Sequence, residues 1–533
     1  MIPHLEIGAR TFPSGLAETR DWIASAWRAL ESISAHRRLT CLALAAAAVA
    51  IRLAALHWVP IPDPAIHDEF SYLLGAETFA AGRLTNPTPA MWVHFETIHE
   101  NFRPTYMTKY PPGQSLLLAL GQKFFGHPWY GVVIGFGLMC GCLCWMLQGW
   151  MPPVYAFIGS LIAITKIGLF GYWMDSYWGG ALAAAAGALV WGAVPRLARR
   201  KPARSALPTA AIGMIVLMNT RPYEGVIACA AAALGVVWLR HRRRRKWNEL
   251  ISLVPIGAAA LVVLLGIAWT ALFNQRVTGS AFIAPYVVNS QTYAAALPFL
   301  FLPAKQPPAY RHESLRRFWV EFDQGTYRRA RANPLSRLLV FKEVLPFYCS
   351  TLLFFAGATA AIFVRSLKLR FALAMLGILW IALLLETFSS PHYLAPVAGM
   401  MFLPALYALR WTRVSSPRAG TLLVLLFTVV SCGHAFFEGA RRPPVVDNRH
   451  SQIERELILK GGQHLVIVEY APSHDVHAEY VYNHADIDPS PVIWARDMGE
   501  SKNRELIDYY PNRTVWRLRP DSPPFRLDAY SNR

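Results

Sequence analysis

Apolar runs of membrane-spanning length recur along the first four-fifths of the chain, and they constrain the fold more than any other feature. About 20 apolar residues in a row cross a bilayer as one helix. The first run covers residues 39–58. Others lie at about 131–149, 154–172, 176–194, 206–219, 223–239, 249–272, 346–364, 371–386, 394–409 and 419–437. The sequence therefore predicts a polytopic α-helical membrane protein with about 11 transmembrane helices.

A formal net charge of +19 could indicate a protein that binds nucleic acid. The positions of the basic residues in the chain argue against this. Much of the charge lies in short arginine-rich clusters between apolar runs. These are residues 196–204, 240–246, 365–370 and 410–418. Cytoplasmic loops carry such an excess of Arg and Lys, so the lipid bilayer is the expected partner and nucleic acid is not. The seven cysteines lie in apolar stretches and predict buried thiols rather than a disulfide framework.

Residues 1–38 lack the early apolar core of a signal peptide and are expected to form a cytoplasmic amphipathic segment. Arg37 and Arg38 precede the first span, which places the N-terminus inside. Counting spans from there puts all four basic clusters inside as well. The transmembrane domain is predicted to cover 39–439, with outer loops 59–130 and 273–345.

The last part of the chain, residues 440–533, is predicted to be a small periplasmic α/β domain. Helices are expected at 448–460 and 500–510, and strands at 464–470, 491–497 and 514–520. It carries no nucleotide-binding fingerprint, so accessory folding or acceptor binding is its expected role. The loop 273–345 is basic and contains Trp319, Phe322 and Tyr327, which fits interfacial helices on anionic lipid or a solvated basic face.

Two adjacent carboxylates, Asp68 and Glu69, open a long polar segment just after the first span. A helix predicted at 70–82 offers a purely structural explanation, because Asp caps helix N-termini and Glu suits the first turn. The functional interpretation is a general base beside a membrane-level cavity, able to take a proton from an attacking hydroxyl. By physics alone either carboxylate fits that role.

Cations follow on the same predicted side. Lys109, beside Tyr110, and Arg221, in the turn Asn219–Gly225, are expected to stabilise a leaving phosphate. The alternatives are an interfacial snorkel for Lys109 and an ion pair between Arg221 and Glu224. The remaining residues predicted to contact substrate are Arg103, Tyr110, Tyr223, Glu224, His392 and Tyr393.

Four polar residues, His94, Glu96, His99 and Glu100, leave a divalent metal ion open as a cofactor. Their spacing matches no strong metal-binding motif, so no metal ligands are assigned. Asp175 is expected to cap a helix or to line a cavity. Lys166, deep in a predicted span, is either a functional midplane group or the sign of a misplaced span end.

In order, the chain has a cytoplasmic N-terminus, one span, Asp68-Glu69-x-x-Tyr72, Lys109-Tyr110-Pro111-Pro112, many spans and a small outer domain. This resembles the GT-C membrane glycosyltransferases, especially bacterial relatives of protein O-mannosyltransferases and of lipid A aminoarabinose transferase. The resemblance covers 39–437 in architecture but only short segments in motif. Tyr110 separates the lysine from Pro111, whereas close relatives often have Lys-Pro-Pro.

The resemblance implies an enzyme of the bacterial cytoplasmic membrane that transfers a sugar, with inversion, from a polyprenyl-phosphate donor to an envelope acceptor outside. It assigns the family's acidic residue to Asp68, with Glu69 beside it, and its lysine to Lys109. A transporter or lipid-glycan flippase is the main alternative, although no internal repeat is evident. A non-catalytic scaffold and a hydrolase or ligase of lipid-linked glycans remain open.

Overall fold

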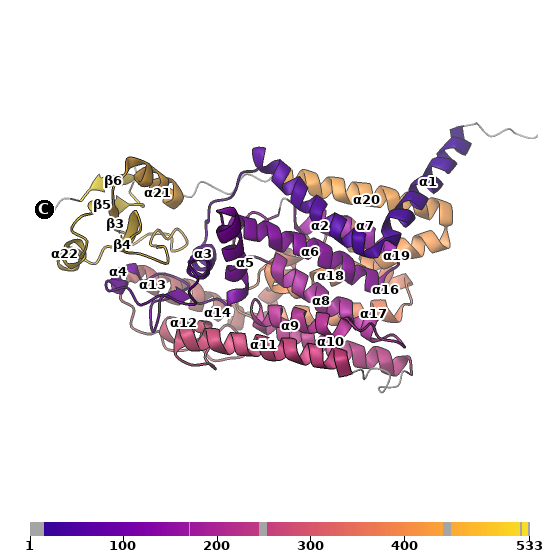
Figure 1. Cartoon of the computed structure of the whole chain (residues 1–533), viewed down its shortest axis with the longest axis horizontal. Helices are drawn as coiled ribbons and strands as arrows, with labels where there is room; N and C mark the ends of the chain where they lie inside the picture. Colours follow the sequence, from indigo (N-terminus) through magenta and orange to yellow (C-terminus); the bar gives the residue numbers. More distant parts are fainter. Residues whose placement is uncertain (1–14, 170, 245–252, 441–448, 523–524, 531–533) are drawn as a thin grey trace, which may run out of the picture.

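The computed structural model describes the chain except for residues 1–14, 170, 245–252, 441–448, 523–524 and 531–533. Long helices lie side by side in a bundle, and the polar segments and the C-terminal domain gather at one end of it (Figure 1). Seven helical segments are long and apolar enough to cross a membrane, or eight if the bent pair ending in α16 is one span. The fold class expected from the sequence, a polytopic α-helical membrane protein, is confirmed.

Each of the 11 predicted spans overlaps an apolar helix, but only seven of them, or eight with the bent pair, are long and apolar enough to be candidate membrane spans, fewer than predicted. The seven candidate spans are α2 (Arg37–Ala54) with η1 (Ala55–His57), α6 (Trp129–Trp150), α10 (Pro222–Arg242), α11 (Leu253–Thr278), α17 (Leu367–Leu384), η5 (Pro391–Val397) with α18 (Ala398–Met401) and α19 (Leu403–Ser415), and α20 (Pro417–Ala440). The bent pair joins η4 (Pro334–Leu339) and α15 (Val340–Tyr348) to α16 (Thr351–Phe363) at an angle of 106°. Three further helices are shorter: α7 (Pro153–Ile167), α8 (Ala181–Leu197) and α9 (Ala206–Met218).

The segment between α7 and α8 differs from the prediction, which continued both helices into it. Asp175 does not cap a helix, because Gly180 is the N-cap of α8. It pairs instead with the fully buried Arg52 of α2, whose Nη2 lies 3.1 Å from Asp175 Oδ1. That ion pair ties the segment to the first span. Lys166 lies in the last turn of α7, 3.1 Å from Glu438, so it marks a span end.

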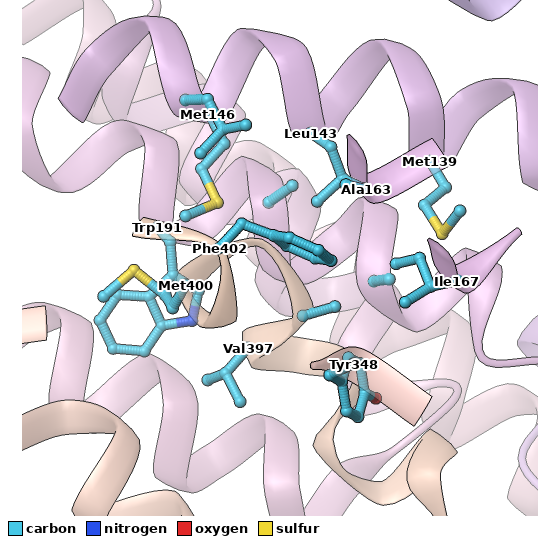
Figure 2. Packing of buried hydrophobic residues seen from close by; sticks show 14 of the residues in the cluster. Met139, Leu143, Met146, Ala163, Ile167, Trp191, Tyr348, Val397, Met400 and Phe402 are labelled. Carbon is cyan, nitrogen blue, oxygen red and sulfur yellow. The ribbon is translucent and has the colours of Figure 1, made fainter. Parts of the chain in front are cut away.

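The bundle core is built on α6 and α8, which are surrounded by other helices. In the apolar stretch of α6, 67% of the residues are buried by other parts of the protein. In the apolar stretch of peripheral α11, only 17% of the residues are buried. Figure 2 shows Phe402 in the middle of the core, between residues of α6 and α7. The labelled residues around it are Met139, Leu143, Met146, Ala163, Ile167, Trp191, Tyr348, Val397 and Met400. Peripheral helices keep apolar side chains exposed, as lipid contact requires.

The four basic clusters meet at one end of the bundle. Lys368 lies close enough to Arg199, Arg243 and Arg410 for their charges to act on it. Helix α1 (Gly15–Ala35) joins this end through the ion pair between Glu31 and Arg413, at 3.8 Å. The C-terminal domain lies at the opposite end (Figure 1). The assignment of the basic end to the cytoplasm stays a prediction.

The outer loops contain secondary structure of their own. Loop 59–130 forms α3 (His67–Ala80), α4 (Trp92–Phe95), the hairpin β1 (Glu100–Asn101) and β2 (Met107–Thr108), and α5 (Pro112–Phe125). Loop 273–345 includes α12 (Pro285–Thr292), α13 (Glu313–Arg316), the π-helical η3 (Arg317–Gln324) and α14 (Gly325–Ala332). Trp319 and Tyr327, expected at a lipid surface, are instead buried inside the outer region, which corrects that prediction.

The C-terminal domain contains α21 (Arg449–Lys460), β3 (His464–Val468), β4 (Val492–Arg496), α22 (Glu500–Tyr509), β5 (Thr514–Arg519) and β6 (Arg526–Ala529). Its sheet has the order β4-β3-β5-β6, parallel except for β6. The predicted helices and strands are confirmed, and the edge strand β6 was missed. The predicted boundary at residue 440 adjoins 441–448, which lie outside the described residues.

The C-terminal domain packs on the first outer loop rather than standing apart from it. Phe95, Phe102 and Tyr106 share one hydrophobic cluster with Leu465 and Ile493 of the sheet. This packing covers the start of α3, where the predicted carboxylates lie.

Candidate active site

Helix α3 begins three residues earlier than predicted, so both carboxylates lie in its first turn. Adjacent helical residues point about 100° apart, which sends Asp68 and Glu69 to different surroundings. Glu69 is 4% exposed and accepts backbone N–H groups of Ala65, Ile66 and Tyr177 at 2.8, 3.2 and 2.9 Å. Burial raises the pKa of Glu69 to about 7, against the effect of these hydrogen bonds. Glu69 thus stabilises the helix start and anchors the segment before α8.

Asp68 is only partly buried, and it does not cap the helix, because the N-cap is Ile66. The Tyr110 hydroxyl donates a hydrogen bond to its Oδ1. The Tyr110 ring stacks on Tyr72, with centroids 4.5 Å apart. Among the described residues Asp68 forms no further hydrogen bond, so the other oxygen of the carboxylate is available to a substrate.

The β1–β2 hairpin brings Lys109 beside His99. Residue Glu100 pairs with Thr108, and the next pair outward is His99 with Lys109, whose N–H donates to the His99 carbonyl at 3.2 Å. The Lys109 ammonium then donates to Nδ1 of His99 at 2.7 Å. Lys109 is therefore not a snorkelling side chain. It is 6% exposed and held by its neighbour across the hairpin.

Aromatic rings and two carboxylates surround the Lys109 ammonium. Its Nζ lies 5.1 Å from the ring centroids of both Tyr110 and Tyr286, and 5.6 Å from that of Trp319. Burial lowers the pKa of Lys109 to about 8, while the charges of Asp68 and Asp323 oppose that change. Asp323 belongs to η3, and burial raises its pKa to about 7. Each outer loop thus contributes one carboxylate whose charge acts on the ammonium.

The turn between α9 and α10 places Arg221 in the same cluster. The N–H of Gly113, at the start of α5, donates to the Asn219 carbonyl at 2.7 Å. A Cβ at Gly113 would lie 2.6 Å from that oxygen, so only glycine allows this approach. The Arg221 guanidinium lies 4.9 Å from the Tyr393 ring centroid. It also forms the expected pair with Glu224, at 3.9 Å, and its contact with a phosphate stays a prediction.

Tyr393 is near both ends of the cluster, because the charges of Arg221 and Asp68 act on it. His392 packs 4.6 Å from the ring of Trp178, and its Nδ1 lies 3.1 Å from the Tyr172 hydroxyl. The described contacts of His392 are with Trp178 and Tyr172, and the charge of Arg221 acts on His392 as well as on Tyr393. Tyr223 donates its hydroxyl to the Ala382 carbonyl at 3.2 Å and packs against the outer loop.

Arg103 lies apart from these residues. It is exposed, and its guanidinium lies 4.7 Å from the ring centroid of Trp92. In the described part of the chain no contact joins Arg103 to Asp68 or Lys109. Its predicted contact with substrate stays untested.

The four residues considered for a metal ion point to different partners. His94 Nδ1 lies 3.3 Å from the Arg496 carbonyl, and Glu96 accepts the Tyr293 hydroxyl at 2.9 Å. His99 holds Lys109, and Glu100 is buried in the hairpin. Across the described ranges, no group of three or more His, Cys, Asp or Glu residues is arranged to hold a metal ion. These side chains do not fit a metal centre.

The C-terminal domain reaches the residue before Asp68. The Tyr482 hydroxyl lies 2.5 Å from Nδ1 of His67. The ring of His477 lies 5.8 Å from that of His67 and 4.4 Å from that of Phe322 in η3. The C-terminal domain thus contacts both the start of α3 and η3.

Sequence reasoning missed three members of this site: His99 as the partner of Lys109, and Asp323 and Tyr286 from loop 273–345. The hairpin register offers a signal for His99, since ten residues separate it from Lys109 across a short turn. Nothing local to Asp323 or Tyr286 indicates the site, because long-range packing of the loop brings them there.

No protein-family model matches the sequence, and no curated protein matches it. Among solved structures, ArnT from Cupriavidus metallidurans in the apo state is similar, with 12% identity, 93% of each chain covered and a TM-score of 0.47. The same protein bound to undecaprenyl phosphate gives 12% identity, 89% and 92% coverage and a TM-score of 0.48. An oligosaccharyltransferase of Archaeoglobus fulgidus, in complex with Zn and sulfate, gives 11% identity, 89% of this chain, 67% of that chain and a TM-score of 0.49.

Proposed function

We propose that this chain is a membrane glycosyltransferase that moves a sugar from a polyprenyl-phosphate donor to an envelope acceptor. The observation that carries the proposal is the convergence of Asp68, Lys109 and Arg221 at the C-terminal-domain end of the bundle. These residues come from three separate parts of the chain. Together they offer a carboxylate with a free oxygen beside two buried or partly buried cations.

Asp68 is the proposed general base. Its free oxygen takes the proton of an acceptor hydroxyl as that oxygen attacks the anomeric carbon of the sugar. The bond between this carbon and the phosphate oxygen breaks as the new bond forms, so the configuration inverts. Glu69 is the less suitable base, because three backbone N–H groups already occupy its carboxylate.

Lys109 and Arg221 are proposed to stabilise the departing phosphate, which leaves with the electron pair of the broken bond. Their charges act where negative charge develops, in a site that burial keeps at low dielectric. Tyr393, near both Arg221 and Asp68, is proposed to line the space between donor and acceptor. The lipid tail would lie among the apolar helices below.

The acceptor is a lipid, protein or polysaccharide of the envelope, reached from the outer face of a bacterial cytoplasmic membrane. The C-terminal domain stands above Asp68 through His67 and Tyr482, so it is proposed to border the acceptor entry.

Release of polyprenyl phosphate distinguishes transfer from transport. The purified chain would be incubated with a lipid-linked sugar fraction and acceptor membranes, and free undecaprenyl phosphate measured by mass spectrometry. Transfer breaks the sugar–phosphate bond and releases this lipid, and Asp68→Asn abolishes the release. A flippase moves the intact donor across vesicles, so sugar translocation without release would overturn the proposal.

A further inference from the structure

The partner of Lys109 is unusual for a buried cation. A buried ammonium is ordinarily paired with a carboxylate, because burying an uncompensated charge is costly. Here the hydrogen-bond acceptor 2.7 Å away is an imidazole nitrogen, Nδ1 of His99. Asp68 and Asp323 act on Lys109 through their charges, and neither forms a hydrogen bond to it within the described structure.

The protonation of this pair follows from the chemistry of its two groups. A lysine ammonium has only donors, so Nδ1 must be the acceptor and the ring proton lies on Nε2. The titratable groups that act on the ring are Lys109, His67 and His477. Burial and the charge of Lys109 lower the pKa of His99 well below its usual value. His99 is therefore neutral at physiological pH.

The backbone at His99 is strained in order to make this contact. Its φ is +69°, a left-handed value that few non-glycine residues adopt. Two hydrogen bonds to its carbonyl hold it there, from the Lys109 N–H at 3.2 Å and the Ser71 hydroxyl at 2.7 Å. Its ring contacts the rings of both Phe318 and Trp319, with centroids 5.5 and 5.9 Å away. Strain that is so firmly held is typical of functional sites.

We propose that His99 is a positioning residue that aims the Lys109 ammonium without adding a third carboxylate to the charges of Asp68 and Asp323, so that the ammonium can still bind a phosphate. A carboxylate at this place would fix the ammonium equally well, but it would compete with the phosphate for it. A neutral acceptor fixes direction alone. The inference rests on the proposed function for the identity of the anion. The effect of His99 on the protonation of Lys109 does not depend on the proposed function.

Two replacements of equal shape separate charge from packing: His99→Gln supplies a neutral acceptor, and His99→Glu a charged one. His99→Leu supplies none. The reactivity of Lys109 toward acetic anhydride would be followed against pH in the full-length protein, by mass spectrometry of the peptide that contains it. Folding would be checked by thermal unfolding.

In His99→Gln, the midpoint of the pH profile of Lys109 labelling is expected to stay within about half a pH unit of that in the wild type. His99→Glu moves it upward by at least about one unit, because an opposite charge favours the ammonium. His99→Leu moves it downward, because a hydrogen bond to the charged form is lost. Identical profiles for Gln and Leu would overturn the inference, even if the Glu variant failed to fold.

Binding of undecaprenyl phosphate provides the second readout. We expect His99→Gln to bind within about threefold of wild type, and His99→Glu to bind at least tenfold more weakly. Equal affinity of the two variants would contradict the role of charge. Failure of the wild-type protein to bind this lipid would count against the proposed function alone, since the labelling profiles still decide the state of Lys109.

Discussion

Two polar clusters lie at the outer end of the molecule, and they differ in how completely their charges are used. The first, here called the Asp68 cluster, consists of Asp68, Lys109, Tyr110, Arg221 and Tyr393. In it, Asp68 receives one hydrogen bond and Lys109 donates one to a neutral ring. Its charged groups keep unused hydrogen-bonding capacity, as a binding site requires.

The second, here called the Arg496 cluster, consists of Arg496, Glu479, Tyr470, Glu96 and Ser314. Arg496 contacts Glu479 at 2.5 Å, the Glu96 carbonyl at 2.6 Å and the Ser314 hydroxyl at 2.7 Å. Burial alone would raise the pKa of Glu479, yet its pKa is lowered because Arg496 favours the carboxylate. The Arg496 guanidinium and the Glu479 carboxylate thus use their hydrogen-bonding capacity within the protein, and the cluster joins both outer loops to the C-terminal domain.

The comparison teaches that burial and charge alone do not identify a site. Both clusters are buried and ionic, but only one leaves capacity for a ligand. Substitutions in the Asp68 cluster should therefore change activity and spare stability, whereas those in the Arg496 cluster should do the reverse.

The largest effect is expected for Asp68→Asn. Loss of the base should lower the transfer rate by about 10²–10⁴-fold with little change in Tm. Glu69→Gln is the matched control, since it removes the neighbouring carboxylate. It should destabilise the protein while reducing activity far less, as steady-state rates and thermal unfolding would reveal. The reverse pattern would make Glu69 the base.

Arg496→Met should produce the largest loss of stability. Removing one partner of a buried ion pair leaves Glu479 uncompensated and costs about 3–5 kcal/mol. The control Arg504→Met breaks an exposed pair with Glu500 in the same domain and should cost under about 1 kcal/mol. Denaturant unfolding of both variants gives the comparison. Equal costs would remove the distinction between the two clusters.

Tyr110→Phe tests the residue that departs from the usual Lys-Pro-Pro pattern. The variant keeps the ring stacked on Tyr72 but loses the hydrogen bond to Asp68, which is worth about 1.5–3 kcal/mol to a charged acceptor. We expect kcat to fall about tenfold or more, with KM for the donor nearly unchanged. A rise in KM with constant kcat would instead make Tyr110 a substrate contact.

The last prediction concerns pH. Lys109 has a pKa of about 8, so the cation is present below that value and is lost as pH rises through it. Donor affinity should therefore fall about tenfold for each pH unit above 8. Titration of donor binding between pH 7 and 10 measures this decline. Affinity that stays constant to pH 10 would exclude Lys109 as the phosphate contact.

The sequence predicts the elements of this fold better than their ends or their meeting points. Apolar runs identify every helix of the bundle, because hydrophobicity is a local property. The ends of α7 and α8 were misplaced because the Arg52–Asp175 pair and the Glu69 contact to Tyr177 are long-range interactions.

For the site, Asp68, Lys109 and Arg221 were predicted together from topology, and the structure brings them into one cluster. His392 contacts Tyr393 of that cluster, Tyr223 packs on Phe299, and Arg103 lies over Trp92. Asp323 could not be predicted from the sequence, because only the folding of loop 273–345 brings it near Lys109.

The central claim is that Asp68 catalyses sugar transfer from a polyprenyl-phosphate donor. Its most direct test compares envelope glycans and glycolipids, by mass spectrometry, from cells that carry wild-type protein or Asp68→Asn at matched abundance. We predict loss of one sugar modification together with accumulation of its polyprenyl-phosphate donor, which would identify donor and acceptor at once. An unchanged profile in a mutant that retains full function would contradict the account.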